Sequence, residues 1–146
     1  MNDHPSIAIP NLLYAYAMRF DDGDFDGAAA LFDKGCLLTG KHRIEGRAAI
    51  TAMWAGWVKT YDGKPRTRHI TTNPIIAVDA DGQGASCQSQ WTVIQAAPGF
   101  PLQIVASGRY CDRFARDGAG WHFKTREFIQ IDLVGDWSAH TLQPLG

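Results

Sequence analysis

His69 is the first residue of this sequence whose type and setting suggest acid-base chemistry. It lies inside 66–73, a polar stretch of Arg, Thr, Ile and Asn residues. A suitable acid, Asp21, follows the apolar run that contains Tyr16 and Phe20. A carboxylate beside a neutral imidazole fixes its tautomer and stabilises the imidazolium that forms when it takes a proton. The sequence therefore predicts a pocket in which Asp21 and His69 meet as a general-base pair.

Helices are expected to position the acid. Between Ile7 and Phe20 apolar residues recur at steps of three and four, which predicts one amphipathic helix. Gly23 ends it, and Asp24 occupies the N-cap position of a second helix. A third helix is expected after Gly46, and its apolar face carries Ile50, Met53, Trp54, Trp57 and Val58. Asp21 should thus lie at the corner between the first two helices.

Strands are expected to position the histidine. A short strand is predicted at 36–39, and four longer runs, at 66–79, 83–97, 101–116 and 120–133, are rich in β-branched and aromatic residues. Short turns separate these runs, which favours an antiparallel meander. We expect an α+β fold in which three N-terminal helices pack on a strongly curved antiparallel sheet, as one domain over 1–146.

Composition limits the classes of function. The chain has 146 residues, of which 45% are hydrophobic and 20% charged, as in one globular domain with its own core. The formal net charge of -1 and the isoelectric point near 6.5 argue against a nucleic-acid partner. No apolar run reaches the roughly 20 residues of a membrane span, and the first residues lack the order of a signal peptide.

The cysteines and histidines predict neither disulfides nor a metal site. Cys36, Cys87 and Cys111 form no CxxC motif, and their odd number favours a reduced, cytoplasmic protein. The remaining histidines show no ligand spacing. We therefore expect no metal and no other cofactor.

Five short motifs, in a fixed order, resemble a known family. They are Leu-Leu-x-x-Tyr-Ala with Asp-x-Gly-Asp-Phe-Asp at 12–26, Glu-Gly-Arg-x-x-Ile at 45–50, Thr-Arg-His-Ile-Thr-x-Asn-Pro at 67–74, Gly-Arg-Tyr-x-Asp-x-Phe at 108–114, and Gly-Trp-His-Phe-x-x-Arg at 120–126. Together, over roughly 7–133, they resemble the SnoaL-like family of the nuclear transport factor 2-like superfamily, in its scytalone dehydratase and bile-acid dehydratase branch. The resemblance implies a cone-shaped barrel around a deep pocket, oligomeric assembly, and cofactor-free elimination by an Asp-His pair.

The same resemblance assigns roles to single residues. It places the catalytic carboxylate on Asp21, the imidazole on His69 and a phenol on Tyr16, while Phe20 stands where a related enzyme has a tyrosine. Arg126 matches an arginine on the last strand that would steady a developing negative charge. The residues expected to contact a substrate are Tyr14, Phe20, Trp54, Trp91, Tyr110 and Arg126.

Structural roles stand beside these functional ones. Asp21 could bond its own turn, and His69 could be a wall residue with satisfied hydrogen bonds. The tyrosines and tryptophans fit a core equally well, and Arg126 could form a surface pair with Glu127.

Two classes of function follow. One is a cofactor-independent lyase (dehydratase) or related isomerase that acts on a small hydrophobic, cyclic substrate through the Asp21 and His69 pair. The other is a non-catalytic ligand-binding or scaffold subunit, similar to the β subunit of ring-hydroxylating dioxygenases. A pair that faces an open cavity favours the enzyme, and a filled cavity favours the scaffold.

The outer face of the sheet predicts self-association. We expect it to expose one of two apolar sets, either Val105, Cys111 and Phe128 or Trp91, Val93 and Ile104. Large apolar patches are uncommon on monomers, so a homodimer or higher homo-oligomer is expected. The tail, defined as residues 136–142, contains a tryptophan and should fold back on its own subunit or reach the neighbour.

Overall fold

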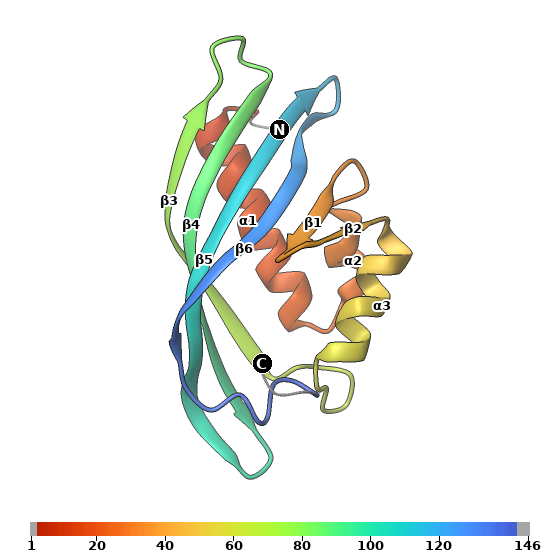
Figure 1. The fold of residues 1–146 in the computed structure, drawn as a ribbon, viewed down its shortest axis with the longest axis vertical. Helices are drawn as coiled ribbons and strands as arrows, with labels where there is room; N and C mark the ends of the chain where they lie inside the picture. Colours follow the sequence, from red (N-terminus) through yellow and green to blue (C-terminus); the bar gives the residue numbers. More distant parts are fainter. Residues whose placement is uncertain (1–2, 143–146) are drawn as a thin grey trace.

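The structure, a computed structural model, describes residues 3–142, which form three helices and one sheet of six strands (Figure 1). The helices are α1 (Pro5–Asp21), α2 (Phe25–Ala30) and α3 (Arg47–Trp57). The strands are β1 (Cys36–Thr39), β2 (His42–Glu45), β3 (Thr67–Val78), β4 (Gly84–Ala97), β5 (Phe100–Asp117) and β6 (Gly120–Val134). The four long strands lie within two residues of the predicted runs.

The corner between α1 and α2 follows from local chemistry. Gly23 turns the chain with a φ of 78°, in the left-handed region that glycine tolerates. A Cβ there would meet the backbone oxygen of Gly63, so this position also needs the smallest residue. The carboxylate of Asp24 accepts the N–H of Gly27 at 2.9 Å and caps α2, as predicted. Asp21, the last residue of α1, is therefore held at a fixed corner.

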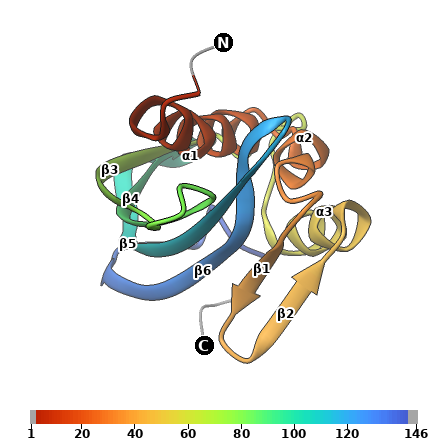
Figure 2. The same cartoon turned by 90° about the horizontal axis from the view of Figure 1, so that it is seen from above.

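The sheet is curved and open. Its strand order is β2-β1-β6-β5-β4-β3, and β1 pairs with β6 in parallel while every other pair is antiparallel. Seen from above, the long strands bend around α1 (Figure 2). The expectation of a purely antiparallel sheet was wrong for one pair, β1 with β6, which is parallel. These two strands are far apart in the chain and are not joined by a short turn, so they need not run in opposite directions. The predicted cone is present, but its sheet does not close into a complete barrel.

Alternation along β4 sorts its side chains onto two faces, as predicted. The buried side chains of this strand are those of Ala85, Cys87, Ser89, Trp91, Val93 and Gln95. They face α1, which crosses the concave side and packs against β3 and β6. The buried face of α1 consists of Ile9, Leu13, Tyr16, Ala17 and Phe20. The core therefore lies between α1 and the concave side.

Bulges alter the register of β5 and β6. A shift between Arg113 and Phe114 skips one residue of β6, so Phe123 and Arg126 both face inward. Strict alternation would place these two residues on opposite faces, with Arg126 on the side of His122 and Lys124. Bulges of this kind bend a strand and re-aim its side chains.

The convex face exposes neither of the two predicted apolar sets as a whole, although Ile104 is exposed and Cys111 is partly exposed. Trp91 and Val93 are on the inner face of β4 and are buried, and Phe128 is partly buried. Val105 is buried because the bulge after Val93 turns both Val105 and Ala106 inward. Three exposed apolar residues of that face, one on each of β3, β5 and β6, form what we call the outer patch. They are Ile70, Ile104 and Leu133, which are 41%, 62% and 68% exposed.

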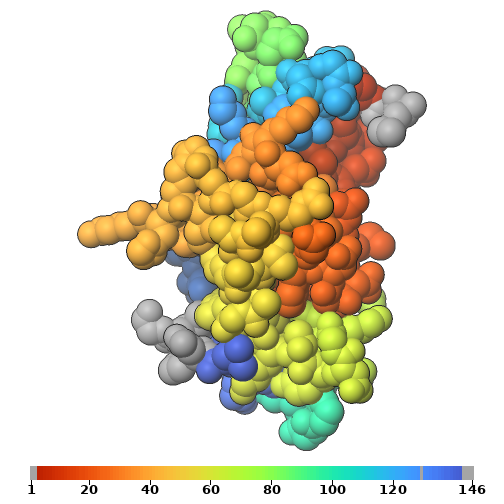
Figure 3. Space-filling view, turned by 90° about the vertical axis from the view of Figure 1, so that its right-hand side faces the viewer, coloured from red at the N-terminus to blue at the C-terminus, as the bar shows by residue number. Residues whose placement is uncertain are grey.

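The tail folds back on its own chain, which is one of the two predicted outcomes. The N–H of Lys59 donates to the oxygen of His140, and the N–H of Leu142 donates to the oxygen of Trp57, both at 2.8 Å. Figure 3, which looks onto the helices, shows the blue tail beside the yellow-green segment that follows α3. The tail thereby closes one end of the space between α3 and the sheet.

Candidate active site

Asp21 and His69 meet where the end of α1 reaches β3. Oδ1 of Asp21 lies 2.6 Å from Nδ1 of His69, and Oδ2 accepts the backbone N–H of the same histidine at 2.7 Å. The hydroxyl of Thr67 donates to Oδ1 at 2.8 Å. The side chains of Asp21 and His69 are only 13% and 9% exposed. The predicted contact between the two residues is therefore present.

These hydrogen bonds set the tautomer of His69. The carboxylate of Asp21 is an acceptor, so Nδ1 of the neutral ring carries the proton and Nε2 keeps its lone pair. The ring of Phe20 packs against the imidazole at 5.0 Å between centroids and limits its rotation. Three donors, the hydroxyl of Thr67 and the backbone N–H and Nδ1 of His69, hold the carboxylate of Asp21 in position. The pair is thus arranged as a base whose free nitrogen is Nε2.

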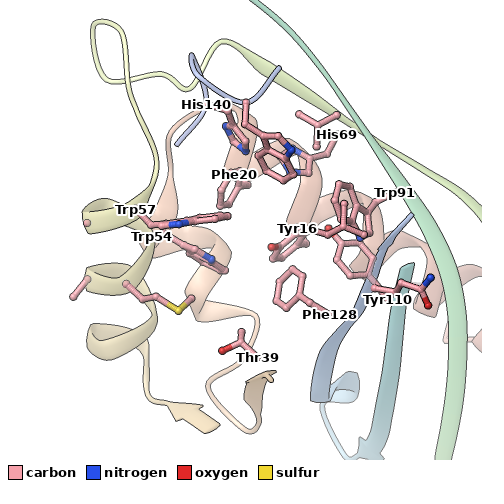
Figure 4. A pocket seen from close by; sticks show the side chains of 17 residues that line it. Tyr16, Phe20, Thr39, Trp54, Trp57, His69, Trp91, Tyr110, Phe128 and His140 are labelled. Carbon is pink, nitrogen blue, oxygen red and sulfur yellow. The ribbon is translucent and has the colours of Figure 1, made fainter. Parts of the chain in front are cut away.

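His69 lines a cavity of about 700 Å³ between α1, α3 and the sheet. Figure 4 shows His69 and His140 at one end of it, Thr39 at the other, and Trp54 and Trp57 facing Trp91 and Tyr110 across the gap. The size falls in the range of small-molecule sites, and most of the walls are aromatic. The lining residues that matter below are Tyr16, Phe20, Thr39, Trp54, Trp57, His69, Trp91, Tyr110, Phe128, Gln130, Trp137 and His140.

Four of the six predicted substrate contacts lie in this wall, and so does Tyr16. The four are Phe20, Trp54, Trp91 and Tyr110. Tyr14 does not, because it projects from the outer side of α1 and is 43% exposed. Arg126 does not line the cavity either, because it is fully buried behind it.

A SnoaL-like domain matches residues 6–127 of the chain. The protein belongs to the SnoaL-like family. This agrees with the family resemblance drawn from the five motifs. No match was found among curated proteins.

Solved structures similar to this SnoaL-like protein support the fold. Rv3472, a protein of unknown function from Mycobacterium tuberculosis, is 27% identical with a TM-score of 0.71, over 87% of this chain and 71% of that one. A putative scytalone dehydratase from Novosphingobium aromaticivorans is 22% identical with a TM-score of 0.70, over 95% and 91% of the two chains. The β subunit of a putative aromatic-ring-hydroxylating dioxygenase from the same organism is 19% identical with a TM-score of 0.67, over 92% and 94%.

Arg126 of this SnoaL-like protein supports the cavity wall from behind. Its guanidinium donates two hydrogen bonds to the carboxylate of Asp112, at 2.9 and 2.8 Å, and both side chains are fully buried. The guanidinium carbon lies 3.7 Å from the ring centroid of Tyr110 and 4.4 Å from that of Tyr16. A cation that close to two aromatic rings attracts both. Arg126 therefore fixes two of the rings that line the cavity.

The phenol of Tyr16 stays protonated. Burial raises the pKa of Tyr16 to about 12, although the positive charge of Arg126 acts in the opposite direction. Burial also raises the pKa of Tyr110 well above its usual range. Both hydroxyls are therefore hydrogen-bond donors at neutral pH.

Two residues of the tail complete the cavity, although neither was predicted to line it. Trp137 and His140 line the end next to His69. His140 lacks an acidic neighbour in the sequence, so it carried no sign of a partner. The signal that could have found it was the tryptophan three residues earlier, which required the tail to cover an apolar surface.

The site offers no arrangement for a metal. Within residues 3–142, no group of three His, Cys, Asp or Glu side chains could hold a metal ion.

Among the same residues, no helix is long and apolar enough to cross a membrane.

Proposed function

We propose that this protein is a cofactor-independent lyase, or a related isomerase, that acts on a small apolar cyclic substrate bearing a carbonyl group. The observation that carries the proposal is the contact of Asp21 with His69 in the wall of an aromatic cavity. A base with a fixed tautomer inside a pocket of this size and polarity suits the removal of a proton from carbon.

The reaction begins at Nε2 of His69. This nitrogen takes a proton from the carbon next to the carbonyl, and the electron pair of the broken C–H bond moves to form an enolate. The imidazolium that results is stabilised by the carboxylate of Asp21 at Nδ1. In a lyase, the enolate expels a hydroxyl group from the neighbouring carbon. This hydroxyl group takes up a proton and leaves as water. In an isomerase, the proton returns to a different carbon.

Tyr16 supports the enolate by hydrogen bonding. A phenol with a pKa of about 12 gives up its proton reluctantly, so a donated hydrogen bond suits it better than full proton transfer. Such a donor stabilises the charge that develops during the reaction, within a mostly aromatic wall. The proton for the leaving hydroxyl then comes from the imidazolium of His69 or from water.

The open cavity favours this function over a scaffold role. The dioxygenase β subunit has the same fold as this chain, but a sequence identity of 19% supports a shared fold and not a shared function. A scaffold requires neither an aromatic cavity nor a partly buried carboxylate in contact with a histidine of its wall. Both features are present, at a volume of about 700 Å³ and a distance of 2.6 Å.

Hydrogen exchange at carbon tests the proposal. The protein is incubated with 2-tetralone, a bicyclic ketone, in deuterated buffer, and loss of the protons next to the carbonyl is followed by NMR. The wild type should accelerate the exchange over buffer, and His69→Gln should abolish the acceleration. His122→Gln, on β6 and outside the cavity wall, is the matched control and should behave as wild type. If the exchange rate is equal in the wild type and in His69→Gln, the proposed role of His69 as the base is wrong.

We further propose that the protein forms a homodimer through the outer patch. Ile70, Ile104 and Leu133 lie on the convex face of three strands, and each is more than two-fifths exposed. Burial of such residues against a second copy removes apolar area from water. Sedimentation at micromolar concentration tests it, and Ile104→Glu should shift the species toward 16 kDa. A wild type that sediments as a single 16 kDa species contradicts the dimer.

A further inference from the structure

His140 is held rigidly at the end of the cavity that contains the base. Its backbone N–H donates to the oxygen of Trp137 at 2.8 Å, and its own oxygen accepts the N–H of Lys59 at 2.8 Å. The oxygen of the preceding residue, Ala139, accepts hydrogen bonds from the hydroxyl of Tyr61 at 2.7 Å and the side-chain amide of Gln95 at 2.9 Å. These bonds fix the tail on both sides, so the ring of His140 has a defined position.

The ring of His140 is enclosed by other rings. It stacks on Trp137 at 5.8 Å between centroids and lies 6.2 Å from the ring of His69. Only 3% of the residue is exposed, and Nδ1 is buried without a hydrogen bond within residues 3–142. A buried polar atom without a hydrogen-bond partner destabilises the folded state, so an apolar ring would pack better here. Packing alone therefore does not explain an imidazole at this place. Because Nδ1 is enclosed, the nitrogen of His140 left to meet a molecule in the cavity is Nε2.

The charge state of His140 fits a role as a hydrogen-bonding group. Burial, together with a smaller effect of the nearby His69, lowers the pKa of His140 to about 4, although the carboxylate of Asp21 acts in the opposite direction. The ring is therefore neutral at pH 7, with one nitrogen that donates and one that accepts. A neutral ring does not repel the imidazolium that forms on His69 during proton transfer.

We propose that His140 is a substrate-binding residue that hydrogen-bonds the oxygen of a flat, mainly apolar ring compound whose acidic carbon lies at His69. The assignment rests on the proposed function of the Asp21 and His69 pair. The two imidazoles, 6.2 Å apart, lie at the same end of the cavity (Figure 4). That spacing suits a carbonyl oxygen and the carbon next to it, each about 3 Å from one ring. The aromatic walls would hold the rest of the molecule.

A pair of matched compounds tests this role. Binding of 2-tetralone and of tetralin, the hydrocarbon without the oxygen, is measured by calorimetry on wild type, His140→Phe and His140→Gln. His140→Phe should weaken binding of 2-tetralone about 3- to 10-fold, the usual effect of one hydrogen bond, and leave tetralin unchanged. His140→Gln retains a donor and should restore much of the difference. His122→Phe, outside the cavity wall, is the control for the substitution itself.

The results separate this proposal from the proposed function. An equal loss for both compounds, no loss for either, or no binding of 2-tetralone to the wild type overturns the role of His140. If His69→Gln stops proton exchange and keeps the preference for 2-tetralone over tetralin, both proposals stand. If exchange is absent in the wild type and the preference depends on His140, the catalytic proposal fails while the binding role is supported.

A measurement on the unaltered protein covers the case in which His140→Phe does not fold. With ¹⁵N-labelled histidine, 2-tetralone should shift the ring nitrogen signals of His140, and tetralin should shift them much less. Signals that respond equally to both compounds overturn the proposal.

Discussion

Asp21 and His69 are 48 positions apart in the chain, and the carboxylate of Asp21 contacts both the ring and the backbone of the histidine. Two contacts from one acid fix the ring and the strand that carries it. Substitution of Asp21 by Asn keeps the size of the side chain but removes its charge. The amide no longer stabilises an imidazolium on His69 and no longer selects the tautomer with a free Nε2.

We therefore expect Asp21→Asn to lower the rate of 2-tetralone exchange by roughly 10²- to 10⁴-fold, the usual contribution of a general base. Affinity for 2-tetralone should change little, because Asp21 lies behind His69 and not in the cavity wall. Asp22→Asn, the next residue along the chain, is the matched control. A variant Asp21→Asn with the exchange rate of the wild type would show that the acid has only a structural role.

Acid should destabilise the protein through His140. The unfolded state binds a proton on this residue below pH 6.5, whereas the folded state binds it only near pH 4. Between these values the unfolded chain holds more protons, so stability falls as the pH decreases from about 6.5 to about 4. A shift of this size corresponds to roughly 3 kcal/mol at most. His140→Phe cannot titrate and should lose less stability over this interval in urea denaturation, whereas an unchanged pH dependence would contradict the assignment.

The pattern of the strands and caps could be predicted because it depends on neighbours in the sequence. The Asp24 cap, the Gly23 turn and the four long strands all follow from local residue types. The contact of Asp21 with His69 was predicted from chemistry and resemblance together. The short strand β2 was missed, since four residues with mixed exposure give little periodicity.

The parts that escaped prediction depend on register and on distant segments. Arg126 reaches the interior only because a bulge shifts β6 by one residue, and its partner Asp112 is on another strand. The position of His140 depends on where the tail folds back, which local pattern does not encode. Both Arg126 and His140 are polar residues, and each is buried by contacts with segments far away in the sequence.

The buried pair of Arg126 and Asp112 gives a prediction about stability. Arg126→Met leaves the carboxylate of Asp112 buried without a partner, and burial already raises the pKa of this acid. Loss of one partner of such a pair costs about 3–5 kcal/mol, which chemical denaturation should detect. Adding Asp112→Leu to Arg126→Met should recover part of the loss, because the stranded charge disappears.

The exposed pair of Arg113 and Asp79 provides the control for this experiment. Its side chains are 45% and 42% exposed, so Arg113→Ala should cost no more than about 1 kcal/mol. If Arg126→Met costs no more than Arg113→Ala, the buried pair does not contribute in the way proposed.

Gly108 leaves the space that the indole of Trp91 occupies in the cavity wall. A Cβ at Gly108 would lie 2.3 Å from the backbone oxygen of Gln130 and 2.5 Å from an indole carbon of Trp91. Gln130 belongs to the paired strand β6 and can move little, so the indole must be displaced toward the cavity. We expect Gly108→Ala to cost about 1–3 kcal/mol of stability, as overpacking usually does, and to weaken 2-tetralone binding. Gly118→Ala, where a Cβ meets nothing within 4 Å, should change neither property. If Gly108→Ala and Gly118→Ala bind 2-tetralone equally well, Trp91 does not set the size of the cavity, and the aromatic wall on the sheet side is not a determinant of binding.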